Sequence, residues 1–509
     1  MIIQSSLYSR VVAGTLLLSL SGLVHTGAAS AQDISGGAGV LLASADIEAK
    51  LGKGIFSSPQ NRPHAAKRPE KKTVARAAHS SRTQRQTSDG KPETDEGSSK
   101  PLGDPPKRVP NAESFGKQGD EFFDAGQYQK AVDAYQQAIK LQPNFPEAYL
   151  NLGQSYFNLG RYDDAIAADK QAMALKPNWS QAYQALGHTY LKMDRSAEAI
   201  EALKQSLSLD PKNDDARNSL SLAYYDQGVA AYNADKYDDA VAAYKEAVNL
   251  KPDYADAYDD LGDAYRRQEK FAEAVEAYKQ AVRFKPDSVD AYTDLSWTYD
   301  KLGRYQEAAD AYRQVIRLKP DDAEANNNMG YALGKTKRWP EAIEAFKRAI
   351  QLKPDYAEAY SNLGWAYNNM GNFTSAMDPL KKAIQLKPDL PEGHFNIGIT
   401  YSRLKQMSEA LAAFQETVKL KADWPAAQNN LGYAYGSQGK WKEAIAAHKE
   451  AVRLKPDYGG AHYNLGVDYL MSGDKKKATE EYQLLQPLNP NNAKLLYQMI
   501  YKKLPPTNP

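Results

Sequence analysis

The chain contains no cysteine among its 509 residues. This absence excludes disulfide bonds, thiolate metal ligands, a cysteine nucleophile and a lipid-modified N-terminal cysteine. An excess of charge of one sign is also lacking, because 64 Lys and Arg residues face 63 Asp and Glu residues. A balanced charge gives the whole chain no general attraction to nucleic acid or anionic lipid, and we expect no nucleic-acid partner.

Long apolar runs are missing except near the N-terminus. Arg10 is the only Lys, Arg, Asp or Glu residue of positions 1–31, and an apolar stretch follows it over 11–24. That stretch is too short to span a hydrocarbon core of about 30 Å. Ala29 and Ala31 flank Ser30 in the small-residue pattern that signal peptidases cleave. We therefore predict a signal peptide over 1–31, cleaved after Ala31, with an uncleaved anchor as the alternative.

A cleaved signal peptide without a lipid-modified cysteine is typical of bacterial periplasmic or secreted proteins. The sequence therefore predicts an exported protein that has no transmembrane span once the signal is removed. It names neither the organism nor the partner, and it leaves the oligomeric state open.

Residues 32–111 show no hydrophobic period and contain one aromatic residue, Phe56. Such a composition buries too little apolar area to offset the entropy of ordering, so we predict a disordered spacer. Between residues 62 and 85, Glu70 is the only acidic residue beside eight basic ones: Arg62, Lys67, Arg68, Lys71, Lys72, Arg76, Arg82 and Arg85. This basic segment is either a solvated tether or a contact for an acidic surface, such as cell wall, lipid headgroups or the protein's own groove.

Residues 112–490 repeat with a period of 34 residues, which gives eleven units. The period is marked by an alanine that recurs at Ala131, Ala165, Ala199, Ala240, Ala274, Ala308, Ala342, Ala376, Ala410, Ala444 and Ala478. A glycine precedes each alanine by twelve positions, except at Ser296, and a proline follows it by twelve, except at Ala422. We expect the small glycine and alanine to face each other where two helices cross. We expect the proline to end the second helix.

Asp or Asn follows the proline, and an acid comes three residues later, as in Asn144 with Glu147 and Asp253 with Asp256. This spacing predicts a capping box at the start of the next helix. Two positions depart from the period. The step from Ala199 to Ala240 is 41 residues, and its seven extra residues, near 214–220, predict a first helix two turns longer. Asp169 stands where most repeats have Tyr or Phe, and it needs a partner or water there.

The repeat resembles the tetratricopeptide repeat family through Tyr360-x-x-Leu363-Gly364-x-x-Tyr367, within the stretch 357–388. The resemblance implies an all-α fold, a right-handed superhelical solenoid of about eleven antiparallel helix pairs preceded by the disordered region. It also implies that the first helix of each pair lines a concave groove. Residues 491–504 read as a helix that caps the last repeat.

Catalytic motifs are absent from the sequence: it has no phosphate-binding loop, no nucleophile elbow and no His-Glu-x-x-His spacing. His394, His448 and His462 replace aromatic residues at packing positions of the repeat, so a structural role is favoured for them. We therefore expect no enzyme activity, no metal and no cofactor.

Three sets of residues on the expected first helices are candidates for a binding groove. The asparagine column stands two residues before the repeat glycine and comprises Asn151, Asn328, Asn362, Asn396, Asn430 and Asn464. The ring column stands three residues further on and comprises Trp297, Tyr331, Trp365 and Tyr433. The acidic stretch of repeats four to six comprises Asp226, Asp259, Asp260, Asp263 and Asp294.

Asparagine is a poor residue for a helix interior, and its amide matches both polar groups of a peptide bond. Similar asparagine ladders line the repeats of O-linked N-acetylglucosamine transferases, although this chain lacks their catalytic domain. The sequence thus predicts a scaffold that binds an extended protein segment in its groove. Three alternatives stay open: the residues serve packing alone, the basic segment masks the groove until a partner opens it, or the scaffold recruits a separate cell-envelope enzyme.

Overall fold

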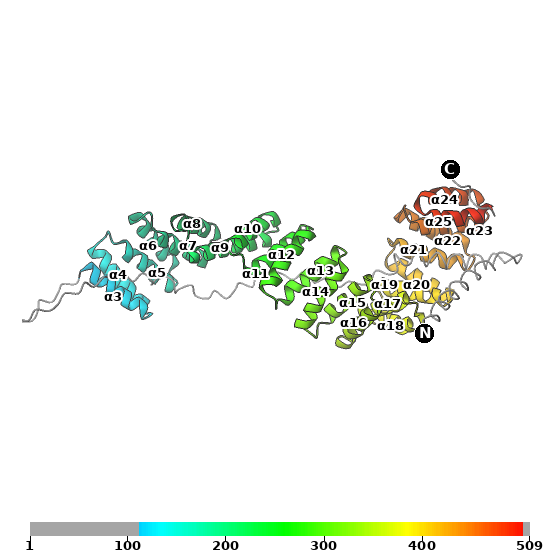
Figure 1. Cartoon of the computed structure of the whole chain (residues 1–509), viewed down its shortest axis with the longest axis horizontal. Coiled ribbons are helices and arrows are strands. Elements are labelled where there is room, and N and C mark those ends of the chain that lie inside the picture. The colour runs from blue at the N-terminus through cyan, green and yellow to red at the C-terminus, as the bar shows by residue number, and fades with distance from the viewer. Residues whose placement is uncertain (1–110, 502–509) are drawn as a thin grey trace, which may run out of the picture. The chain divides into compact units, whose positions relative to one another are not determined.

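The computed structural model describes residues 111–501, and every regular element within this range is an α-helix (Figure 1). The predicted signal peptide and spacer lie outside these residues. The described helices belong to two compact units, which meet between Arg304 and Tyr305 in the sequence and are taken separately below.

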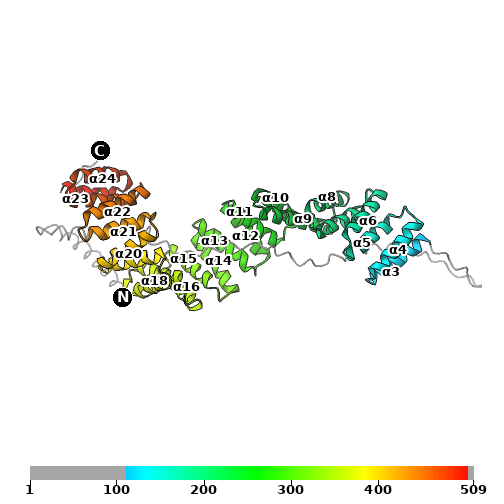
Figure 2. The ribbon, with the colours of Figure 1, turned by 180° about the vertical axis from the view of Figure 1, so that it is seen from behind.

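The first unit contains α3 (Ala112–Asp124), α4 (Tyr128–Leu141), α5 (Pro146–Asn158), α6 (Tyr162–Leu175), α7 (Ser180–Lys192), α8 (Ser196–Leu209), α9 (Asp214–Asn233), α10 (Tyr237–Leu250), α11 (Ala255–Arg267), α12 (Phe271–Phe284) and α13 (Val289–Lys301). The second unit contains α14 (Tyr305–Leu318), α15 (Ala323–Lys335), α16 (Trp339–Leu352), α17 (Ala357–Asn369), α18 (Phe373–Leu386), α19 (Pro391–Arg403), α20 (Met407–Leu420), α21 (Pro425–Gly436), α22 (Trp441–Leu454), α23 (Gly459–Met471), α24 (Lys475–Leu488) and α25 (Pro490–Tyr501). Within each unit, consecutive helices pack as antiparallel hairpins that stack on one another (Figure 2).

Helix lengths follow the sequence period closely. The second helix of each hairpin has 14 residues, as α4 and α12 do, and the first helix usually has 13, as α5 and α11 do. Helix α9 has 20 residues, so the seven extra residues of the long step extend this first helix by about two turns. The predicted longer helix is confirmed.

The predicted capping boxes are wrong at three sites. The N-cap residues of α5, α11 and α17 are Phe145, Tyr254 and Tyr356, and none of them makes a side-chain capping bond. A turn after the proline carries the chain one residue further before the helix begins. Side-chain caps form where this later position holds a residue with a short polar side chain, as Asn213 and Ser288 show.

Each hairpin closes around its repeat glycine. A Cβ atom added to Gly262 would lie 2.5 Å from the ring of Tyr278, which stands four residues after the repeat alanine. The nearest neighbour of the glycine is therefore this larger side chain. The same contact joins Gly119 to Tyr135, Gly187 to Leu203, Gly228 to Tyr244, Gly330 to Phe346, Gly398 to Phe414 and Gly432 to His448. The alanine predicted to face the glycine also lies close, because a Cβ atom on Gly330 would lie 3.1 Å from the Ala342 carbonyl oxygen.

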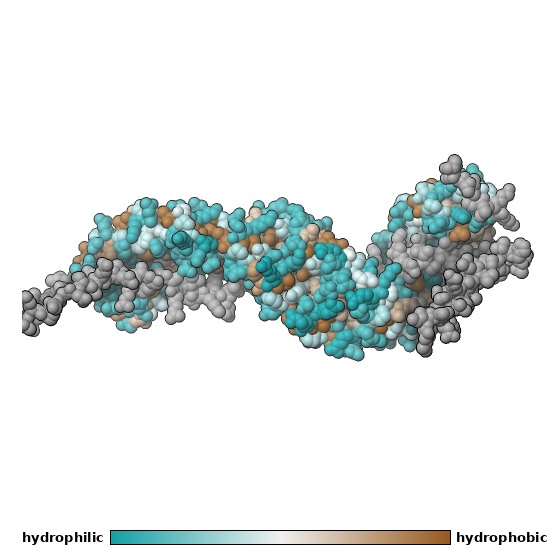
Figure 3. All heavy atoms as spheres, viewed as in Figure 1, coloured by the Kyte–Doolittle hydropathy of each residue, from teal (hydrophilic) through white to brown (hydrophobic). Residues whose placement is uncertain are grey.

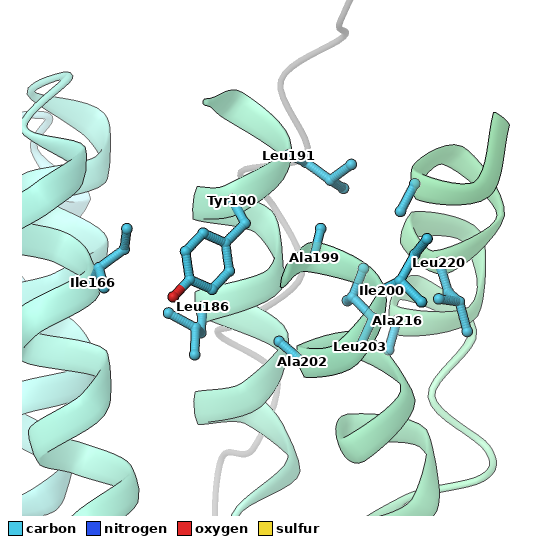
Figure 4. Close-up of a cluster of buried hydrophobic side chains, with 11 residues drawn as sticks. Ile166, Leu186, Tyr190, Leu191, Ala199, Ile200, Ala202, Leu203, Ala216 and Leu220 are labelled. Carbon is cyan, nitrogen blue, oxygen red and sulfur yellow. The ribbon is translucent and has the colours of Figure 1, made fainter. Parts of the chain in front are cut away.

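Apolar contacts also run from one hairpin to the next. The cluster in Figure 4 joins Ile166 of α6 to Leu186 and Tyr190 of α7, and continues to Leu203 of α8 and Leu220 of α9. Burying a leucine side chain contributes about 1.5–3 kcal/mol. Because the cluster draws on successive hairpins, each hairpin depends on its neighbour for stability.

Polar side chains cover most of the face seen in Figure 3, and its hydrophobic patches are small and scattered. Among residues 111–501, none of the helices combines the length and the apolar character that crossing a bilayer requires.

Asp169 of α6 is an exception within this packing. It occupies the position of the aromatic residue opposite Gly153, and its side chain is buried. Its Oδ1 has no hydrogen-bond partner among the described residues. Burial raises the pKa of Asp169 well above its ordinary value. The folded chain therefore holds a proton on Asp169 that the unfolded chain releases at lower pH.

We expect Asp169→Leu to stabilise the second hairpin by about 1–3 kcal/mol at neutral pH, because it removes a buried polar group without a partner. Leucine already fills the equivalent position at Leu203 and Leu380. Since the folded pKa of Asp169 is raised, the native chain loses stability as pH rises above about 4, and the variant lacks this loss. Hydrogen exchange of α5 and α6 at pH 5 and pH 8 measures both effects.

Asp163→Leu, at an exposed position of the same helix, is the control and should bring no gain. Faster exchange in Asp169→Leu than in the native chain would contradict this account of the site.

Candidate functional site: a polar line along the first helices

The asparagine column lies on the first helices of successive hairpins. These helices touch one another directly, as α17 touches α19 and α21 touches α23. Residues at one repeat position therefore follow each other along the face that the first helices share within a unit. The geometry of this face decides what the column can bind.

Several of the column amides tie their first helix to the preceding first helix. Asn362 Nδ2 donates to Asn327 Oδ1 at 2.9 Å, and Asn464 Nδ2 donates to Asn429 Oδ1 at 3.0 Å. In both pairs the acceptor stands one residue before the column position of the preceding hairpin. Asn396 Nδ2 repeats the pattern with the Ser361 hydroxyl oxygen at 3.3 Å. The column thus has a structural role, which the repeat pattern alone did not show.

Three members of the column make other contacts. In the hairpin before Asn430, the acceptor position holds Phe395, whose side chain cannot accept a hydrogen bond. Asn430 Nδ2 instead donates to the Ala426 carbonyl oxygen of its own helix, at 2.7 Å. Asn151 Nδ2 donates to Asp120 Oδ1 at 3.0 Å. Asn328 Oδ1 accepts from the neighbouring Asn327 Nδ2 at 3.2 Å.

Exposure divides the asparagine column into two groups. Asn328, Asn362 and Asn396 are buried, whereas Asn151, Asn430 and Asn464 are partly exposed. In this structure, the partly exposed amides are the ones that an incoming chain reaches without a rearrangement.

A cavity of about 190 Å³ opens beside the first of these amides. Helices α3 and α5 contribute most of its lining, which includes Gly116, Asp120, Phe145 and Asn151. Asp120 Oδ1 is fixed there by two donors, because it also accepts from the Tyr135 hydroxyl at 2.7 Å. The cavity therefore presents an oriented carboxylate and an amide beside an aromatic wall.

The ring column packs between hairpins in the second unit. The rings of Tyr331 and Trp365 stack with centroids 5.9 Å apart, and Trp339 meets Trp365 edge-on at 5.1 Å. A Cβ atom on Gly334 would lie 2.6 Å from the Trp365 ring, so the ring needs this glycine. The period did not single out Gly334 or Trp339, because only repeat ten has the same pair, at Gly436 and Trp441.

Tyr433 remains partly exposed, and its hydroxyl oxygen is buried without a hydrogen-bond partner among the described residues. Burial raises the pKa of Tyr433, against the effect of Arg403. Tyr433 lies three residues after Asn430 on α21, so both side chains share one helix face.

Trp297 of α13 is buried between aromatic and basic side chains of its own unit. The Phe271 ring packs against it at 6.0 Å, and the cationic groups of Arg266 and Lys301 lie 5.6 and 4.8 Å from its centroid. Its indole Nε1 has no hydrogen-bond partner among the described residues. The ring thus already makes cation–π contacts with two basic side chains of the protein.

The acidic stretch is brought together on α9, α11 and α13. Asp263 is buried and accepts hydrogen bonds from the Tyr278 hydroxyl at 2.5 Å and from Arg266 at 2.9 Å. Asp263 is therefore part of the hairpin core, and sequence reasoning missed both of these partners.

Asp259 lies in the middle of this cluster of carboxylates. Its Oδ1 is shielded from solvent and has no hydrogen-bond partner among the described residues. Burial raises the pKa of Asp259 well above its ordinary value, and repulsion from Asp263, Asp294, Asp260 and Asp290 adds to the increase. Burial raises the pKa of Tyr254 in the same region, and the nearby Asp226 and Asp260 add to the increase. A cation beside Asp259 would relieve this repulsion.

Two histidines of the last hairpins hold buried protons. His448 Nδ1 lies 2.6 Å from Asp468 Oδ2, and its Nε2 lies 3.0 Å from the Asn429 carbonyl oxygen. His462 Nδ1 lies 2.7 Å from Glu481 Oε2, and its Nε2 lies 2.9 Å from the Pro456 carbonyl oxygen. A carbonyl oxygen only accepts, so each Nε2 carries a hydrogen and a further proton belongs between each Nδ1 and its carboxylate. The structural role predicted for both histidines is confirmed.

Among residues 111–501, no three His, Cys, Asp or Glu side chains are grouped as metal ligands. The chemistry that the first-helix face offers is therefore hydrogen bonding, ring contact and negative charge.

The hydrogen bond to Glu481 raises the pKa of His462 above its ordinary value. A raised folded pKa stabilises the chain at low pH, and this stabilisation is lost as pH rises through that folded pKa. We expect amide exchange in α23 and α24 to accelerate beyond the intrinsic change as pH rises above about 6.5, the ordinary pKa of histidine. His462→Tyr restores the residue that other repeats have here, as at Tyr258, and should flatten this pH dependence.

The hairpin α15–α16 contains no histidine and provides the internal control. Equal pH dependence in the native chain and in His462→Tyr would show that the His462–Glu481 pair is not responsible.

Models of known protein families match most of the described helices. A family described as TPR repeat matches residues 119–160 and 435–473. Families described as Tetratricopeptide repeat match residues 145–212, 225–289, 293–357, 329–391 and 391–423. The matches therefore reach into both compact units.

Solved structures similar to the chain include yeast Tom70, at 15% identity and a TM-score of 0.38, over 77% of this chain and 96% of that one. MamA is 30% identical with a TM-score of 0.31, over 33% of this chain and 92% of its own. YrrB, titled a TPR protein with an unusual peptide-binding site, is 24% identical with a TM-score of 0.33, over 38% and 96%. No curated protein sequence matches the chain.

Proposed function

The chain belongs to the tetratricopeptide repeat family, and from that premise we propose that it is a scaffold that binds an extended segment of another protein along its first helices. The observation that carries this proposal is the asparagine column, whose amides follow one another on touching helices. The family typically acts through protein contacts, and we propose that this chain does so without catalysis or a cofactor.

The partly exposed amides suit a peptide backbone. Asn464 donates one of its two amide hydrogens to Asn429, and Asn430 donates one to its own helix. The second N–H and the carbonyl lone pairs of each amide match the C=O and N–H groups of an extended chain. Tyr433 lies on the same helix face as Asn430 and offers a ring to a ligand side chain.

The buried amides support the same surface in a different way. Asn362 and Asn396 bind the preceding first helix and so hold the hairpins in register. We therefore propose that repeats ten and eleven contact the ligand directly in the second unit, and that the cavity beside Asn151 is a separate contact site of the first unit. The other column residues position the helices between contacts.

We expect Asn430→Ala with Asn464→Ala to weaken peptide binding about tenfold or more, because each lost hydrogen bond costs about 1 kcal/mol. The probe is a fluorescent twelve-residue peptide selected on the full chain from a random display library. Fluorescence polarisation gives the dissociation constants, and circular dichroism confirms that the variant remains helical.

The matched control is Glu443→Ala with Lys449→Ala, two exposed positions of second helix α22 whose joint change keeps the net charge. Native affinity in the asparagine variant, or an equal loss in the control, would refute binding along the first helices.

We also propose that the protein is exported. The support is the sequence of residues 1–31, which lie outside the described part of the chain. Ala29 and Ala31 occupy the positions that a signal peptidase reads as small.

Expression in a bacterial host should yield an extracytoplasmic protein whose first residue is Gln32, as N-terminal sequencing measures. Ala31→Leu should block this cleavage and leave the longer form in the membrane fraction. A cytoplasmic protein that starts at Met1 would contradict export.

A further inference from the structure

The acidic stretch contains groups for which packing gives no partner. Asp259 Oδ1 and Trp297 Nε1 are buried without a hydrogen-bond partner among residues 111–501, and Trp297 is 8% exposed. Burial raises the pKa of Asp259, and the carboxylates around it add to the increase. A buried acceptor, a buried donor and crowded negative charge together suit a cationic chain segment that also brings backbone acceptors.

Aromatic and acidic groups alternate along this part of the first helices. Trp297 follows Asp294 by three residues on α13, so the ring and the carboxylate share one face. The ring already accepts Arg266 and Lys301 as cation–π partners. Arg and Lys side chains of a ligand find the same two kinds of contact here, carboxylate and ring.

One cationic segment belongs to the chain itself. Between residues 62 and 85 the sequence has eight Lys or Arg residues against Glu70, and this segment lies outside the described residues. It remains in the protein after cleavage at Ala31. We propose that residues 62–85 occupy the acidic stretch on α9, α11 and α13 in the free protein, and that a partner's cationic segment displaces them. This inference rests on the proposed scaffold function, because it assigns the regulation of the same first-helix face.

The connecting chain is long enough for this contact. Residues 86–110 separate the basic segment from Asn111, and 25 residues reach at most about 85 Å. The first helices from α3 to α11 touch in sequence. Four steps at a packing distance of about 10 Å reach α11, and a fifth step to α13 gives a path of about 50 Å, within that reach.

Attachment also makes a weak contact effective. A segment on a tether of this length has an effective concentration in the millimolar range at its own binding site. An affinity of the free segment near 100 μM therefore keeps the site mostly occupied. A partner with several cationic groups competes successfully when it also engages the asparagine column.

The experiment uses a synthetic fluorescent peptide with the sequence of residues 62–85, added to the full mature chain. We compare the native chain with Lys67→Gln, Arg68→Gln, Lys71→Gln and Lys72→Gln combined, which weakens its own basic segment. The peptide should bind this variant at least tenfold more tightly than the native chain. The gain should shrink as salt rises from 50 to 300 mM.

The matched control replaces four exposed lysines of second helices by glutamine, namely Lys170, Lys381, Lys442 and Lys449, and should bind the peptide as the native chain does. Adding Asp259→Asn and Asp294→Asn to the weakened chain should abolish binding of the peptide. These changes remove repulsion between carboxylates, so they leave folding intact, as circular dichroism will show.

Equal affinity for the native and the weakened chain would overturn occupation by the basic segment and leave the scaffold function standing. Absence of binding to either chain would overturn this inference and also remove cationic segments from the ligands of the scaffold. Binding that persists after Asp259→Asn and Asp294→Asn would place the segment elsewhere and likewise overturn the inference.

Discussion

The close crossing of the two helices at the repeat glycine is the contact on which the rest of the structure depends. At Gly262 the absent Cβ leaves room for the Tyr278 ring, which is fully buried between the helices. Any larger residue at the glycine would collide with the ring and push the helices apart. Because the crossing recurs with the period, first helices that touch within a unit bring residues of one repeat position close together.

This alignment turns a sequence column into a physical surface. Asn464 reaches Asn429 across two hairpins because α21 and α23 touch, and Asn362 reaches Asn327 in the same way. The amides therefore stabilise the stack. The acidic stretch is less completely paired than the asparagine column. Asp263 accepts hydrogen bonds from Tyr278 and Arg266, whereas Asp259 is buried near other carboxylates. We infer that an outside cation completes this second region.

The period predicted the helices and the long α9 well, because glycine, alanine and proline recur for reasons of backbone packing that hold in every hairpin. It misplaced the caps, since whether a helix starts at Asp253 or after Tyr254 depends on a turn whose geometry no single residue sets. It also did not reveal that Gly334 receives the Trp365 ring, because this contact occurs in one joint only. A repeat pattern identifies equivalent positions, whereas hydrogen-bond partners such as Arg266 depend on which side chains happen to be neighbours.

The account's central claim is that ligands lie along the first helices. A photo-crosslinking amino acid placed at Tyr433 tests this claim most directly, with the same amino acid at Lys449 of a second helix as the comparison. With a peptide selected on the chain, we predict a crosslinked product at position 433 and none at position 449. Crosslinking at position 449 without crosslinking at position 433 would place the ligand on the second helices and contradict the account.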